Sequence, residues 1–213
     1  MVPAVRLHEF DTRGAAAQAA ANRLAESLEL ALAEASAVGL LVSGGSSPRE
    51  CLEILSRKVL DWQRVVVLPT DERCVAPDDP ASNERMVRAQ LLQNHARMAT
   101  YERPRPGEHA PGEIAAALVG MGEDGHFASI FPDAPPELRL LDVEARAGYH
   151  RIATASSEYQ RITANLSLLL RARSVCLLVF GDAKKRVLSC PGDLPVHSLI
   201  AQSSVPVEVI WAP

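Results

Sequence analysis

Hydrophobic positions along the chain form two patterns, and the first consists of short, continuous apolar runs. Such runs are typical of strands that are covered on both faces. They predict strands at residues 38–42, 65–68, 114–119, 175–180 and 207–211, with weaker patterns at 98–102 and 149–154. Because few polar residues interrupt these runs, we expect the strands to lie inside the molecule.

The second pattern is apolar spacing of three and four residues, which indicates helices. It predicts helices at residues 12–36, 48–60, 83–94, 161–170 and 182–188, the third of them capped by Ser82 or Asn83. Strands that alternate with helices predict an α/β fold with a mostly parallel sheet. We therefore expect a three-layer, open, Rossmann-like domain with helices on both faces, formed by residues 1–213 as a single unit.

One connection does not fit this pattern well. Residues 103–113 contain three prolines and two glycines and are predicted to be a loop. They are too few for a parallel crossover, which needs about a dozen residues or more. Either one sheet face is less covered, or residues 98–102 do not pair in parallel.

Composition and charge exclude several classes of protein. The chain has 213 residues, 23% of them charged, and a net charge of −4 without a long basic run, which argues against nucleic acid as a partner. No apolar stretch approaches the roughly 18 residues of a membrane span, and the first residues resemble no signal peptide. We expect a cytoplasmic protein without a membrane partner. Its cysteines lack C-x-x-C pairing and are expected to be reduced: Cys51, Cys74, Cys176 and Cys190.

The stretch "SGGSSP" connects the strand at 38–42 to the next helix. Ser43, Gly44, Gly45, Ser46 and Ser47 precede a proline at the first helical position. Glycines let the backbone approach a ligand, and a helix N-terminus offers N–H groups that suit a phosphate. Ser47 also fits the S-x-x-E capping box. The sequence thus allows a phosphate socket or an ordinary capped turn.

Three other predicted strands also end in polar residues. Asp71, Glu72 and Arg73 follow the second strand, and a glycine-rich turn with Asp124 and His126 follows the strand at 114–119. Ligands of open α/β sheets bind at the carboxyl ends of strands, although charges there also simply face water. Histidine has an ordinary pKa of about 6.5 and exchanges protons near neutral pH.

The strand at 175–180 is followed by "GDAKKR". Lys184 or Lys185 falls in the first helical turn, where a bound anion would offset its unfavourable position in the helix dipole. Both can equally be surface lysines. The remaining histidines are scattered, so we expect no metal site, and "SGGSSP" fails the dinucleotide pattern G-x-G-x-x-G. We expect no cofactor.

These motifs together resemble the 6-phosphogluconolactonase family. "SGGSSP", "TDER", "GMGEDGHFASIFP", "RIT" and "VFGDAKKRVL" occur in the family's order between residue 42 and about residue 190. The resemblance implies hydrolysis of 6-phospho-D-glucono-1,5-lactone to 6-phosphogluconate, the second step of the oxidative pentose phosphate pathway. It also implies a sugar phosphate lactone as the partner, with no organic cofactor and no obligatory metal. We expect a monomer or a weak homodimer.

The resemblance also assigns roles to residues. His126 is expected to be the general base, and Asp124 to hold its tautomer. Arg73, Lys184 and Arg161 are expected to hold the phosphate. Glycine N–H groups in 43–45 or 120–122, which include Gly122, are candidates for the oxyanion site. Asp71 either binds sugar hydroxyls or orients Arg73, and Lys184 is preferred over Lys185 for its G-x-x-K spacing.

Two alternatives have different sequence signatures. Glucosamine-6-phosphate deaminases, on a similar fold, carry an aromatic residue after the acidic pair and "N-E-P" after the G-H block. Here Arg73 follows the pair, and Ser129-Ile130-Phe131-Pro132 stands where "F-N-E-P" is expected. A non-catalytic sugar-phosphate sensor would keep the anion site and lose the base, whereas His126 is retained.

Overall fold

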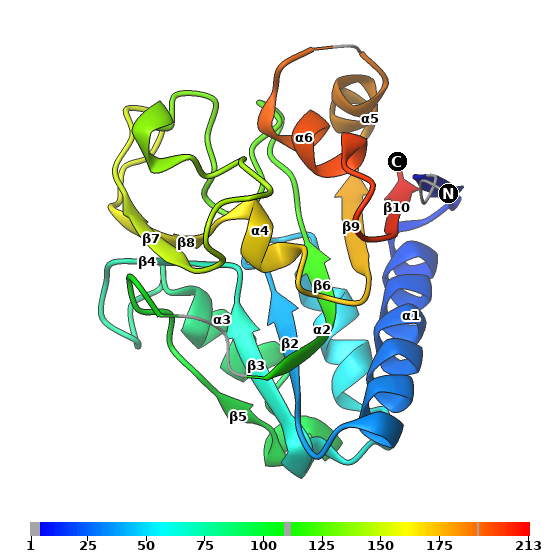
Figure 1. Ribbon diagram of the computed structural model, residues 1–213. Helices are drawn as coiled ribbons and strands as arrows, with labels where there is room; N and C mark the ends of the chain where they lie inside the picture. Colours follow the sequence, from blue (N-terminus) through cyan, green and yellow to red (C-terminus); the bar gives the residue numbers. More distant parts are fainter. Residues whose placement is uncertain (1–4, 109–111, 191) are drawn as a thin grey trace.

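The computed structural model describes residues 5–108, 112–190 and 192–213, and it is built on a seven-stranded, entirely parallel sheet (Figure 1). The strand order is β1-β10-β9-β6-β2-β3-β5. The strands are β1 (Arg6–Glu9), β2 (Val38–Val42), β3 (Val65–Pro69), β5 (Thr100–Tyr101), β6 (Glu113–Val119), β9 (Val175–Phe180) and β10 (Val207–Ala212). The predicted open, mostly parallel α/β fold is confirmed.

The order of the strands fixes where a ligand site can form. From β2 the chain builds outward through β3 to β5, and from β6 it builds in the opposite direction through β9 to β10. The two directions meet between β2 and β6, which pair directly, for example Val42 with Leu118. A crevice forms outside the carboxyl ends of strands at such a switch point. The topology alone therefore places the site at the ends of β2 and β6.

Three helices cover one face of the sheet: α1 (Arg13–Glu34), α2 (Pro48–Ser56) and α3 (Asn83–Gln90) (Figure 1). The buried side of α1 consists largely of alanine, for example Ala17 and Ala20, which allows the helix to lie close to the strands. Thr12 caps α1 by accepting the N–H of Ala15 at 3.2 Å. This layer is the conventional part of the fold.

The other face is covered differently. Here lie α4 (Leu166–Leu169), α6 (Pro195–Ala201) and a three-stranded antiparallel sheet of β4 (Asp71–Arg73), β8 (Arg161–Ala164) and β7 (Tyr149–Ile152). Helix α5 (Asp182–Ser189) follows β9 and buries no residue fully. Short 3₁₀ turns are found at Trp62–Arg64, Asn94–Met98 and Pro136–Leu138. The small sheet reaches the edge where β2 and β6 end, and it supplies one wall of the site.

The predicted helix at residues 161–170 is wrong. Arg161–Ala164 is strand β8, which pairs with β4 on one side and β7 on the other, and only Leu166–Leu169 is helical. The β-branched side chains of Ile162 and Thr163 favour a strand. Asn165 then starts the helix by accepting the N–H of Leu168. Tertiary pairing thus overrides the apolar spacing.

The capping box at Ser47 is also wrong. Ser47 already has helical backbone angles, and its side chain makes no capping hydrogen bond. A capping residue needs an extended backbone for its side chain to reach back to the N–H groups of the first turn. The backbone N–H groups of this turn are therefore left for another partner.

The structure decides between the two alternatives given for the short connection at residues 103–113. Strand β5 does pair in parallel with β3, so the alternative that residues 98–102 do not pair in parallel is wrong. The connection runs along the small sheet, where Gly107 N–H donates to Tyr149 O at 2.9 Å. The small sheet therefore occupies the place of a crossover helix over the described residues.

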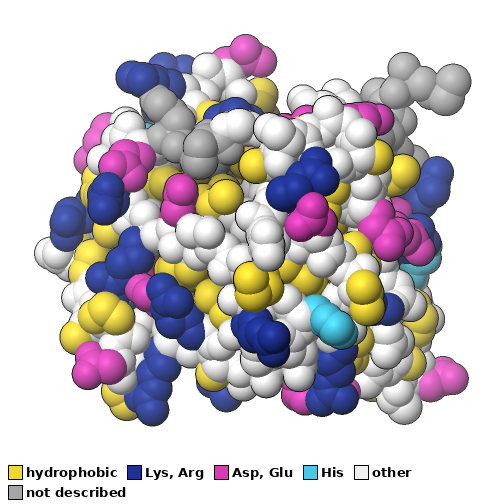
Figure 2. All heavy atoms as spheres, turned by 90° about the horizontal axis from the view of Figure 1, so that it is seen from below, with side chains coloured by type: hydrophobic (Ala, Val, Ile, Leu, Met, Phe, Trp, Pro, Cys, Tyr) yellow, Lys and Arg dark blue, Asp and Glu magenta, His cyan; other side chains and the backbone are white. Residues whose placement is uncertain are grey.

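The end of the molecule away from the switch point is an ordinary polar surface. Figure 2 shows Lys, Arg, Asp and Glu side chains interspersed there with small apolar areas. Among the described residues, no helix is long and apolar enough to span a bilayer. All four cysteines are free thiols, and Cys51 and Cys176 are buried.

Candidate active site

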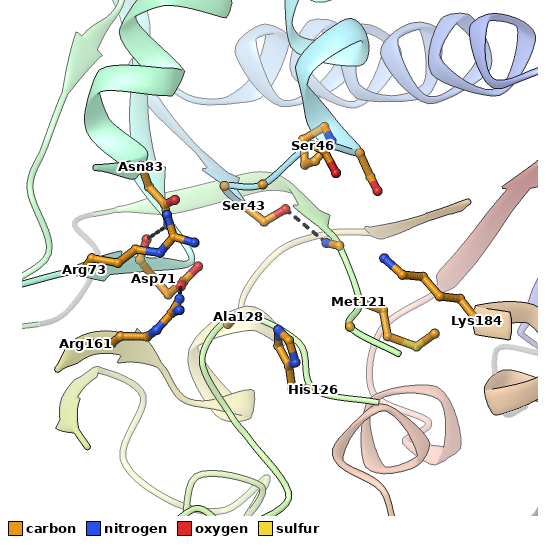
Figure 3. Close-up of a pocket in the computed structure, with 16 residues that line it drawn as sticks. Ser43, Ser46, Asp71, Arg73, Asn83, Met121, His126, Ala128, Arg161 and Lys184 are labelled. Carbon is orange, nitrogen blue, oxygen red and sulfur yellow. Dashed lines mark hydrogen bonds and ion pairs between the residues drawn. The ribbon is translucent and has the colours of Figure 1, made fainter. Parts of the chain in front are cut away.

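A pocket lies at the carboxyl edge of the main sheet (Figure 3). Four strand ends and the small sheet contribute to it. It is lined by Ser43, Gly44, Gly45, Ser46, Ser47, Pro48, Asp71, Arg73, Asn83, Gly120, Met121, Gly122, His126, Ala128, Arg161 and Lys184. The expectation that these strand ends meet at one edge is correct.

The loop after β2 presents unpaired backbone donors to the pocket. Among the residues that the structure describes, no group accepts a hydrogen bond from the N–H groups of Gly44, Gly45, Ser46 or Ser47. The loop leads directly into α2, whose N-terminus carries partial positive charge. Ser43, in contrast, is already engaged: its hydroxyl accepts the N–H of Gly120 at 3.0 Å and thereby connects the loop after β2 to the loop after β6. The arrangement can hold an anion.

His126 lies on the pocket wall with one ring nitrogen already paired. Its Nδ1 is 2.6 Å from Asp124 Oδ1. An ionised carboxylate only accepts hydrogen bonds, so in the neutral imidazole this contact places the proton on Nδ1 and leaves Nε2 with its lone pair. Gly122 makes this pairing possible, because a Cβ there would lie 2.3 Å from the imidazole. Asp124 itself does not line the pocket.

Asp71 is a buried carboxylate that faces the same pocket. It is 4% exposed, and its Oδ2 accepts the hydroxyl of Ser129 at 2.5 Å. Arg161 Nη1 lies 3.4 Å from Oδ2. Burial lowers the pKa of Arg161 from its usual value, and the charge of Asp71 opposes that shift. The pair is fixed, and its remaining polar atoms can meet hydroxyl groups of a ligand.

Arg73 is anchored through its neighbour Glu72. The Glu72 carboxylate is 4% exposed and accepts the backbone N–H groups of Arg73, Asn83 and Glu84 at 2.7–2.8 Å. It thereby joins β4 to the start of α3. The Arg73 guanidinium donates to Ala81 O at 2.6 Å, while its Nε has no partner among the described residues.

The two candidate lysines differ in their contacts. Lys185 Nζ is 2.7 Å from Glu9 and lies over the ring of Trp211. Lys184 lines the pocket, and no described side chain pairs with it. In Figure 3 it enters from the side opposite Arg73 and Arg161, with His126 between them. The pocket is therefore cationic at both ends.

Sequence reasoning missed several lining residues. Asn83 is the most informative of them: it is 2% exposed, its amide donates to Asp71 O at 2.9 Å and it packs against Gly44. Met121, Ala128 and Pro48 line the wall through positions inside recognised motifs. In the sequence, Asn83 belongs to the "SN" that follows "TDER" and was interpreted only as a possible helix cap, so its place in the pocket wall was not predicted.

Comparisons with known proteins agree with this geometry. The family model of glucosamine-6-phosphate isomerases/6-phosphogluconolactonase matches residues 11–210. A 6-phosphogluconolactonase of Mesorhizobium japonicum is 34% identical, with 96% of this chain and 94% of that protein covered.

The chain belongs to the glucosamine-6-phosphate isomerase/6-phosphogluconolactonase family.

Other members of the family are similar over the same length. A 6-phosphogluconolactonase of Rhizobium meliloti is 32% identical, with 97% of this chain and 98% of that protein covered. The crystal structure of a 6-phosphogluconolactonase from Shewanella baltica is 30% identical and superposes with a TM-score of 0.88, covering 100% of both chains. The match includes every strand end that contributes to the pocket. The family name covers two activities, and the residues of the pocket have to distinguish them.

Proposed function

We propose that this protein hydrolyses 6-phospho-D-glucono-1,5-lactone to 6-phosphogluconate, the second step of the oxidative pentose phosphate pathway. The observation that carries the proposal is the His126–Asp124 pair, which leaves Nε2 free to take a proton inside a pocket with cationic ends. The similarity to named 6-phosphogluconolactonases over nearly the whole chain supports it.

The reaction uses His126 twice. Nε2 takes a proton from a water molecule, and the resulting hydroxide adds to the lactone carbonyl carbon. The tetrahedral intermediate then collapses, the bond between this carbon and the ring oxygen breaks, and His126 returns its proton to that oxygen. Proton transfer of this kind contributes about 10²–10⁴-fold. Asp124 holds the imidazole tautomer and stabilises the imidazolium that forms.

The oxyanion needs donors that are not already used. Gly120 N–H donates to Ser43 and Gly122 N–H donates to His126 O. Within 120–122 this leaves Met121, whose N–H has no hydrogen bond among the described residues. We assign the oxyanion to this N–H because it lies in the loop that carries the base. Donors aimed at developing charge are a large contribution to catalysis.

The phosphate belongs at the end formed by Lys184 and the loop after β2. There a helix N-terminus coincides with N–H groups and an ammonium group that have no partner within the part of the chain that the structure describes. Arg73 and Arg161 lie at the other end, where Arg161 is already paired with Asp71. With Asp71, they bind the lactone ring and its hydroxyls. Binding energy from the remote phosphate then orients the carbonyl against His126.

The deaminase alternative lacks its acid. The residue aligned with the glutamate of "N-E-P" is Phe131, whose ring lies against His126 at a centroid distance of 4.5 Å. A phenyl ring exchanges no proton. A sensor has no need of a histidine held by a carboxylate, so both alternatives are disfavoured.

The test is the rate of lactone hydrolysis by His126→Asn. We expect a folded protein that loses about 10²-fold or more of kcat, because no other described histidine lines the pocket. Spontaneous lactone hydrolysis is subtracted from each rate. A variant within threefold of the wild-type kcat would exclude His126 as the base.

A further inference from the structure

Among the described residues, only Asp124 forms a hydrogen bond with the His126 imidazole, and it contacts one edge of the ring. The two side chains are 29% and 42% exposed, and no other described group hydrogen-bonds to the imidazole. A partly exposed pair of this kind restrains orientation weakly, because water competes for both groups. A base that must aim Nε2 at one carbonyl needs a second support.

Phe131 provides that support from the same loop. Its ring is 5% exposed, and its centroid lies 4.5 Å from that of the imidazole at a tilt of 36°. The segment before it is fixed to the small sheet, since Ser129 N–H donates to Thr163 Oγ1 at 3.1 Å and the Ser129 hydroxyl donates to Asp71. The imidazole therefore rests on a ring whose own position is set by β4 and β8.

The same ring is in contact with a cation. The Arg161 guanidinium carbon is 5.4 Å from the centroid of Phe131, and Arg161 Nε donates to Ser157 Oγ at 2.8 Å. Aromatic faces attract cations. Arg161 is thus held over the ring by contacts on both its sides, which stiffens the surface against which His126 packs.

We propose that Phe131 is a positioning residue for His126: its buried ring fixes the plane of the imidazole so that Nε2 faces the lactone. This inference rests on the proposed function, in which His126 is the base. It gives the residue aligned with the deaminase acid a role of its own in lactone hydrolysis.

The test compares Phe131→Leu with Phe131→Tyr. Leucine keeps apolar bulk but loses the ring, and we expect kcat to fall about tenfold, since a small misalignment of a catalytic group is costly, with KM within twofold. Tyrosine keeps the ring and should retain kcat within threefold. Leu141→Ala, which alters the hollow behind Phe131 without touching the imidazole, is the matched control and should leave kcat unchanged.

A double-mutant cycle separates positioning from general damage. In a His126→Asn background, Phe131→Leu should change the residual rate less than twofold, because there is no base left to orient. The proposal is overturned if Phe131→Leu lowers the rate equally in both backgrounds, if tyrosine is as damaging as leucine, or if KM rises as much as kcat falls. Failure of the proposed function looks different, because His126→Asn would then keep the wild-type rate.

Discussion

At the scale of single residues, the charged side chains that follow β3 are more buried than their sequence suggests. Asp71 and Glu72 are each 4% exposed, so the alternative that these charges simply face water is wrong for both. Backbone hydrogen bonds to Glu72 offset the free-energy cost of burying its charge. Contacts with Ser129 and Arg161 do the same for Asp71. One carboxylate builds the wall of the site and the other faces its interior.

Lys184→Ala should selectively damage hydrolysis of the phosphorylated lactone. A charge-assisted hydrogen bond is worth roughly 1.5–3 kcal/mol, so kcat/KM should fall about tenfold or more. Activity on unphosphorylated gluconolactone should stay nearly constant. Steady-state kinetics on both lactones measure this ratio.

Lys185→Ala is the control for that measurement. Lys185 is paired with Glu9 and lies over Trp211, so its loss should leave the ratio unchanged. Equal losses on the two lactones for Lys184→Ala would show that the phosphate is bound elsewhere, and the first place to look would be the end that contains Arg73.

At the scale of elements, helix starts differ in what holds them. Thr12 caps α1 with its side chain, whereas Ser47 at α2 does not. Thr12→Ala should therefore lower the free energy of unfolding by about 0.5–2 kcal/mol. For a chain of this size each kcal/mol lowers the Tm by roughly 2–4 °C.

Ser47→Ala should leave the Tm unchanged, because its hydroxyl satisfies no N–H group of α2. Thermal unfolding of the two variants side by side measures the difference. If both lose the same stability, the Ser47 side chain caps the helix in solution.

The elements that were predictable are those defined by apolar runs. Strands β2, β3, β6, β9 and β10 follow from such runs, because each is covered on both faces. Strands β1 and β4 are largely polar, and pairing with β10 and β8 makes them strands, whereas β8 was hidden by apolar spacing that continues into α4. The candidate site was largely predictable because its motifs sit at strand ends, whereas Asn83 depends on how α3 meets β4.

At the scale of the whole molecule, the buried thiols make the stability of the fold depend on pH. Burial raises the pKa of Cys176 to about 12 and raises that of Cys51 well above its usual value. Unfolding returns both pKa values to about 9, so from there upward the unfolded chain holds fewer protons than the folded one. Stability from these thiols is complete below pH 9 and is lost as the pH rises toward 12.

We therefore expect the free energy of unfolding to fall by about 1 kcal/mol per thiol between pH 9 and pH 10. Urea denaturation at the two pH values measures the change. A Cys51→Ala, Cys176→Ala double variant is less stable overall but should show a smaller fall over this interval. An identical fall in the double variant would assign the effect to other groups.

The position of β10 has a consequence for synthesis on the ribosome. This strand lies between β9 and β1 and pairs in parallel with both, as in Arg6 with Glu208. Strand β1 emerges first, yet about 200 residues must follow before its only described neighbour in the sheet exists. At typical elongation rates the nascent chain carries an unpaired strand for roughly 10–40 s. Charged residues stand at both ends of β1, Arg6 and Glu9, and charged side chains are one of the devices by which exposed strands avoid pairing with other chains.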